Sequence, residues 1–320
     1  MNSSIRHSAF LLAAAALAAA ADPAAPPVRT ANGLALPAPA GFVDAAFFFP
    51  EVAEYARIAA EADRENRTLA YFVQPMPDGF GMEAFAKVYR KLDGRICDRS
   101  VLPELAKAFS DPSFDRKLEQ GVKETSDRRS KGLSETFGVQ ESFAAPRHLP
   151  VHRTTPRSVH FSLTSAVRSV GEEGIEAEST LVGSCGILWI RGRLLSLNVS
   201  TSIADAEDPG ALDAALAETR DAVRGWEAAV VASNALLRID GDPVADPSEL
   251  AAEDALAVRE GGNRLLTARN FRKGGFSFGR LGLDMAIGAV VGGIVGLVNW
   301  LKKRRREKEP QPGDLTHYRW

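Results

Sequence analysis

Few residues of this chain have the types and spacing that chemistry needs. Gly183-Ser184-Cys185-Gly186 places two nucleophile types, a hydroxyl and a thiol, side by side. It differs from the G-x-S-x-G elbow of hydrolases, in which glycines flank the serine at two-residue spacing. Strand alternation directs Cys185 to an apolar face, where a thiol is inert, and directs His160 to the opposite, wet face. The pattern therefore argues against a Cys/His hydrolase.

Metal and cofactor patterns are also missing from the sequence. His148, His152 and His160 are separated by four and eight residues among prolines, which matches no zinc or copper motif. The carboxylates of Asp205–Asp221 lack the D-x-D-x-D-G order of a calcium loop, and no glycine-rich phosphate loop follows a strand. We therefore expect no catalytic residue, no metal and no cofactor.

Two cysteines, Cys97 and Cys185, are the only ones in the chain. In an oxidising compartment they could pair, and closing a loop of 88 residues would contribute about 4 kcal/mol in the chain-entropy model. Two unpaired buried thiols are the alternative, because cysteine packs as a small hydrophobe. The sequence leaves both open.

The N-terminus resembles a secretory signal peptide. Arg6 and His7 precede a 13-residue apolar stretch, Ala9–Ala21, which ends in three alanines that suit signal peptidase. We expect a signal peptide over residues 1–21 and a flexible Ala/Pro-rich leader over 22–33. An uncleaved signal anchor is the alternative, although the stretch is short for a membrane span.

A second apolar segment, Leu281–Leu301, predicts a transmembrane helix. Met285–Val298 contains no charged residue, and 21 residues of helix measure about 31 Å, enough for a hydrocarbon core. A cluster of five cations follows the segment and predicts a cytoplasmic tail over residues 302–320: Lys302, Lys303, Arg304, Arg305 and Arg306. The alternative, a buried helix of the folded domain, is less favoured because such helices rarely end in a basic cluster.

Three glycines within this segment have helical spacing. Gly288, Gly292 and Gly296 lie four residues apart, so they share one helix face on which a second helix could approach closely. They predict self-association or contact with another envelope protein inside the membrane.

The residues between the two membrane signals predict one α+β domain over 34–239. Helical periodicity marks Glu51–Asp63, a segment from Asp111 to about Leu133, and Ala211–Leu237, and two shorter helices are expected at Ala84–Leu92 and Leu102–Phe109. Short strands are expected at Leu34–Leu36 and Leu69–Gln74, and alternation after Val159 predicts antiparallel strands with one wet face and a hairpin turn at Arg191-Gly192-Arg193. Prolines make Ala144–Arg157 a surface connection.

The fold class is thus an antiparallel sheet of about four to six strands covered by amphipathic helices, plus one C-terminal transmembrane helix. Residues 240–280 are expected to form a juxtamembrane linker with one short helix, opened by the capping box Asp246-Pro247-Ser248-Glu249 and closed by Gly261-Gly262.

The composition of this domain gives no indication of nucleic-acid binding, and we expect no nucleic-acid partner. Residues 22–280 carry 31 Lys and Arg against 37 Asp and Glu, a net charge of −6. The membrane signals, with the alanine- and arginine-rich composition, predict a single-pass protein of a bacterial inner membrane with its domain in the periplasm. A binding or scaffolding module of the cell envelope is the favoured function. An envelope hydrolase whose site is dispersed in sequence is the alternative.

Overall fold

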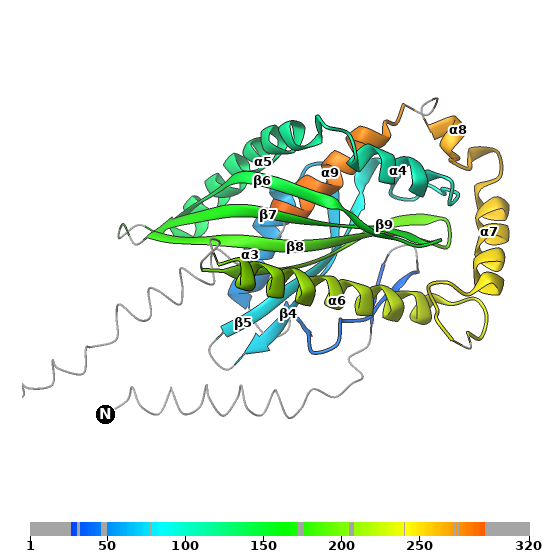
Figure 1. Cartoon of the computed structure of the whole chain (residues 1–320), viewed down its shortest axis with the longest axis horizontal. Coiled ribbons are helices and arrows are strands. Elements are labelled where there is room, and N and C mark those ends of the chain that lie inside the picture. Colours follow the sequence, from blue (N-terminus) through cyan, green and yellow to red (C-terminus); the bar gives the residue numbers. More distant parts are fainter. Residues whose placement is uncertain are drawn as a thin grey trace, which may run out of the picture.

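The computed structural model describes residues 27–30, 33–45, 50–76, 79–171, 174, 176–204, 208–239, 241–271, 273 and 275–291. They form an α+β fold around one seven-stranded antiparallel sheet of order β3-β4-β5-β9-β8-β7-β6 (Figure 1). Several predicted features lie outside the described residues: the signal peptide, residues 22–26 and 31–32 of the leader, Gly292, Gly296, Lys302, Lys303, Arg304, Arg305 and Arg306.

The sheet strands are β3 (Val43–Asp44), β4 (Asn66–Met76), β5 (Gly79–Tyr89), β6 (Val139–Thr154), β7 (Ser158–Gly171), β8 (Glu176–Ile190) and β9 (Arg193–Ile203). A separate pair consists of β1 (Val28–Arg29) and β2 (Ala35–Leu36). The described residues contain seven α-helices: α3 (Pro50–Ala62), α4 (Val101–Phe109), α5 (Phe114–Phe137), α6 (Pro209–Asn234), α7 (Pro247–Gly261), α8 (Ala268–Phe271) and α9 (Phe278–Val291).

Both faces of the sheet are covered. α4, α5 and α9 pack on one face with Phe161 and Cys185, whereas α6 packs on the other with Leu197 (Figure 1). The prediction of one wet face is wrong, because the apolar residues of β7 and β9 point to opposite faces and each face needs its own cover. His160, expected on the wet face, is fully buried beneath α6.

Elements with strong local signals form where they were predicted. α3, α4 and α6 match the expected helices within about three residues, and the side chain of Asp246 caps α7 by accepting from the backbone N–H groups of Ser248 and Glu249. The hairpin between β8 and β9 turns at Arg191 and Gly192, which both have positive φ (46° and 75°). Two positive φ angles are the signature of the type I′ turn, which suits the twist of antiparallel strands.

Three predictions about the sheet are wrong. The expected helix Ala84–Leu92 is mostly β5, whose small residues Ala84 and Ala86 are buried in the sheet centre. The expected surface connection Ala144–Arg157 is mostly β6, which tolerates its prolines because it is the edge strand. The sheet therefore has seven strands instead of four to six.

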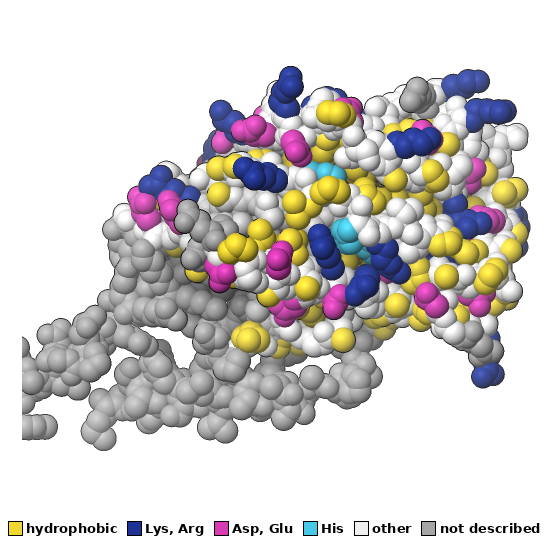
Figure 2. Space-filling view, viewed as in Figure 1, with side chains coloured by type: hydrophobic (Ala, Val, Ile, Leu, Met, Phe, Trp, Pro, Cys, Tyr) yellow, Lys and Arg dark blue, Asp and Glu magenta, His cyan; other side chains and the backbone are white. Residues whose placement is uncertain are grey.

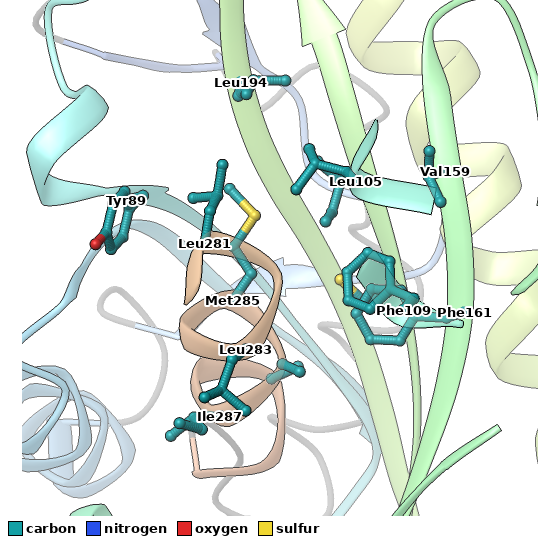
Figure 3. Close-up of a cluster of buried hydrophobic side chains, with 14 of the residues drawn as sticks. Tyr89, Leu105, Phe109, Val159, Phe161, Leu194, Leu281, Leu283, Met285 and Ile287 are labelled. Carbon is teal, nitrogen blue, oxygen red and sulfur yellow. The ribbon is translucent and has the colours of Figure 1, made fainter. Parts of the chain in front are cut away.

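The predicted transmembrane helix is not supported. Among the described residues no helix is both long and apolar enough to cross a bilayer. The first half of the segment forms most of α9, in which every residue from Leu281 to Val291 is buried against the sheet, α4 and α5. Figure 3 shows Leu281, Leu283, Met285 and Ile287 of α9 in a cluster of buried hydrophobic side chains that also contains Phe109 and Phe161. Apolar side chains that hydropathy assigns to lipid are here the core of the fold.

Gly288, predicted to face another helix in the membrane, is also inside the fold. A Cβ atom at this position would lie 2.7 Å from Asn66 Nδ2 and 2.8 Å from Asp63 Oδ2. The absence of a side chain therefore serves close contact within the domain.

Candidate functional site

The residues singled out from sequence are mostly sequestered. Cys97 and Cys185 are free, buried thiols, and burial raises the pKa of each to about 12, so neither is a ready nucleophile. Ser184 is buried and hydrogen-bonded to Ser162 and Thr219. Within the described part of the chain, no three His, Cys, Asp or Glu residues are grouped to hold a metal ion.

Among the polar assemblies of the described residues, we compare two that lie on opposite faces of the sheet. The first, here the α9 network, comprises Tyr55, Asp63, Asn66, Lys87, Arg129 and Glu141. Lys87 Nζ donates to Asp63 Oδ2 at 2.8 Å and to the carbonyl oxygen of Gly288 at 2.9 Å. Both side chains are almost fully buried.

Arg129 extends the α9 network to Val291, the last described residue of α9. Its guanidinium lies 2.7 Å from Glu141 Oε2 and also donates to the carbonyl oxygen of Val291. A buried cation needs acceptors, and backbone carbonyl oxygens supply them here beside the carboxylates. Lys87 and Arg129 donate to carbonyl oxygens in the last described turn of α9 and so fasten this helix to the sheet and to α5. This network is therefore structural.

The second assembly, here the α6 cluster, comprises His152, Arg153, His160, Arg220, Arg224 and Glu227. β6 and β7 place Arg153 opposite His160 in the ladder, and the register is irregular between Leu149 and Arg153. Although His152 is the next residue to Arg153, its ring centroid lies 6.2 Å from that of His160. The irregularity thus brings two successive β6 side chains to the same site.

α6 supplies the other half of the cluster. Arg220, Arg224 and Glu227 are spaced i, i+4 and i+7, so they project from one helix face. Glu227 Oε2 accepts from Arg153 at 2.6 Å and lies 3.0 Å from His160 Nε2. Arg220 donates from Nε to Ser162 Oγ at 3.1 Å. Figure 2 shows basic side chains gathered beside a histidine on this face.

The cluster does not have the geometry of a hydrolytic triad. Ser158 Oγ lies 2.9 Å from His160 Nε2, the same nitrogen that faces Glu227. A Ser-His-acid relay needs the serine and the acid on different ring nitrogens. His160 Nδ1 is buried without a partner among the described residues, next to Gly186. His160 therefore holds Glu227 in place and does not activate Ser158.

Burial and neighbouring charges together set the protonation of His152 and Glu227. Partial burial lowers the pKa of His152 to about 4, and its electrostatic interactions with Arg220, Arg224 and Arg153 contribute to the decrease. Burial alone would raise the pKa of Glu227, but His160, Ser158 and Arg153 together bring it below its usual value. At neutral pH the site thus combines a neutral His152, an ionised Glu227 and three arginines.

Sequence reasoning missed the α6 cluster. In the sequence, Arg220 and Arg224 lie on the polar side of the amphipathic helix Ala211–Leu237, and His152 belongs to no metal motif. One signal was present: Glu227 lies next to Trp226 within the apolar stripe of α6, where a carboxylate needs a buried partner. The partner itself depends on the pairing of β6 with β7.

No protein-family model matches the chain, and the comparisons with curated proteins and with solved structures gave no match either.

Proposed function

We propose that this chain is a binding module of the bacterial cell envelope and that the α6 cluster is its recognition surface. One observation carries the proposal: three arginines and an exposed histidine converge from two elements onto one place. The two terminal nitrogens of Arg220 have no hydrogen-bond partner among the described residues. Such unsatisfied donors at a solvent-accessible site are suited to an external partner.

We further propose that the module is exported and held at the inner membrane by the residues after α9. Export rests on the signal peptide expected over residues 1–21. After Val291 the sequence offers ten residues with no charge, 292–301, followed by the five cations of 302–306. Ten helical residues would measure about 15 Å, half a hydrocarbon core, so attachment to the anionic bilayer surface suits this sequence better than crossing it.

A hydrolase has less support than a binding module. Ser158 and Glu227 compete for one nitrogen of a buried histidine, and both thiols have raised pKa values. The accessible groups of the α6 cluster are cationic or neutral donors, which suit recognition of an anionic partner.

Photo-crosslinking in intact envelopes tests the recognition surface. A photo-reactive residue at the exposed position Asp221 should give crosslinked products that disappear when Arg220→Glu and Arg224→Glu are introduced together. The matched control is Arg168→Glu, which reverses an exposed arginine of β7 paired with Glu176. Products that survive the double reversal, or that Arg168→Glu removes equally, would refute the proposed surface.

Extraction of membranes tests the attachment. Surface attachment predicts that alkaline carbonate or high salt releases the full-length chain, and that replacing the five cations of 302–306 by glutamine releases it further. A chain that stays in the pellet under both treatments would instead support a spanning segment.

A further inference from the structure

We propose that the α6 cluster is a binding site for an oxyanion of the phosphate type. This inference rests on the proposed recognition surface and specifies the chemistry of its ligand. The donors come from Arg220 and Arg224 of α6 and from His152 and Arg153 of β6.

The fixed part of the site holds the half-buried side chain of Arg220 by its Nε atom. Ser162 Oγ accepts from Arg220 Nε and is itself held 3.1 Å from Ser184 Oγ, which lies 2.9 Å from Thr219 Oγ1. This buried hydroxyl chain anchors one edge of the guanidinium. The two terminal nitrogens stay available as a fork, the geometry that matches two phosphate oxygens.

The charges around this fork favour an anion and disfavour a cation. Arg153 is 29% exposed and forms an ion pair with the buried carboxylate of Glu227, which neutralises most of its charge. Arg224 donates to Asp221, whose side chain is 68% exposed, so that pair is weak and open to exchange. Arg220 has no carboxylate partner among the described residues, which leaves it as the primary anion ligand.

His152 completes the site as an adjustable donor. The groups that face it are Arg153 and His160 from the strands and Arg220 and Arg224 from α6, all of which disfavour its protonation. A bound dianion would offset these positive charges and favour the protonated ring, which then offers an additional charged donor. Binding and protonation of His152 should therefore be coupled.

A phosphate group could come from a lipid headgroup or from a free phosphate compound, and two experiments separate these sources. The full-length chain, with 15N-labelled histidine, is titrated with inorganic phosphate at constant ionic strength, with chloride as the reference. The chain is then mixed with phosphatidylglycerol vesicles or with phosphatidylcholine vesicles. The His152 signal is assigned by its loss in His152→Gln.

The expected result is a shift of the His152 signal with phosphate and not with chloride, and an increase in its pKa of about one unit or more. Arg220→Gln combined with Arg224→Gln should weaken the response at least about tenfold, whereas Arg168→Gln should leave it unchanged. A response to phosphatidylglycerol alone would assign the site to lipid phosphate, and a response to inorganic phosphate to a free ligand.

The inference is overturned by either of two results. One is a chloride response equal to that of phosphate; the other is no Arg220-dependent response to any phosphate source. If the crosslinks at Asp221 persist in that case, the recognition surface stands and only the ligand class is wrong. If the crosslinks are also independent of Arg220 and Arg224, the proposed function fails as well.

Discussion

The α9 network and the α6 cluster lie on opposite faces of one sheet and use the same kinds of side chain, but they differ in access to water. In the α9 network, the side chains of Arg129 and Glu141 are at most 1% exposed, and that of Lys87 is 3% exposed. In the second, Glu227 is just as buried, but Arg153 reaches solvent and His152 and Arg224 are exposed. A fully enclosed charge pair can only stabilise or destabilise the fold, whereas a pair with one exposed end can also exchange partners.

Because the α9 network is enclosed, we expect that removing one of its charges lowers the stability of the fold strongly. Arg129→Met should lower the free energy of unfolding by about 3–5 kcal/mol, because Glu141 would keep its charge in the core without its cationic partner. Urea unfolding of the full-length chain measures the effect. Arg57→Met is the matched control, since Arg57 is 51% exposed in its pairs with Glu54 and Glu61, and it should change stability by less than about 1 kcal/mol. Equal losses in both variants would contradict the structural role of the α9 network.

The glycines of two helices offer the next comparison. Gly288→Ala in α9 should cost about 1–3 kcal/mol, because the new methyl group would meet Asn66 and Asp63. Gly225 in α6 has open space at its Cβ position, and Gly225→Ala should be neutral or stabilise by up to about 1 kcal/mol. Unfolding by urea compares the two. If Gly288→Ala leaves stability unchanged but alters oligomer size in membranes, the predicted helix-association face would be right and the packing of α9 wrong.

Locally encoded elements were accessible from the sequence, and their spatial environment was not. The helical spacing of α3 and α6 and the type I′ hairpin at Arg191-Gly192 depend on neighbouring residues only. Hydropathy identified residues 281–291 as apolar, but it measures transfer out of water and does not distinguish a bilayer from a protein core. Alternation along β9 gave its two faces correctly without telling which helix would cover each one.

The candidate site depended even more on long-range pairing. Arg220 and Arg224 were visible as a polar helix face, and His152 as a histidine in a proline-rich stretch. Their meeting requires the edge strand β6, its irregular register and the packing of α6 on β8 and β9. None of these is encoded within a short window of sequence.

A third prediction concerns Asp284 of α9. Burial raises its pKa to about 6, although Arg280 opposes the shift, so the folded state binds a proton that the unfolded state releases near pH 4. Stability is therefore highest at low pH for this group and falls as the pH rises from about 4 to 6. Asp284→Asn, which resembles the protonated acid, should stabilise the chain by about 1–2 kcal/mol at pH 8, after allowance for the lost Arg280 contact. Unfolding at pH 8 and near pH 4 tests this, because the gain should vanish at the lower pH. A gain that is independent of pH would exclude titration of Asp284 as its cause.

The smallest expected effect lies on the α6 face. Arg220→Gln should change the free energy of unfolding by less than about 0.5 kcal/mol, since within the described part of the chain Arg220 makes one part-buried hydrogen bond, to Ser162, and no ion pair. Arg129→Met and Arg220→Gln thus each remove one positive charge, from opposite faces of the sheet. Arg129→Met should lower the stability and leave the anion response, whereas Arg220→Gln should weaken the anion response and leave the stability. An Arg220→Gln chain that unfolds as easily as Arg129→Met would mean that the α6 cluster holds the fold together, and its arginines could no longer be regarded as donors kept for a ligand.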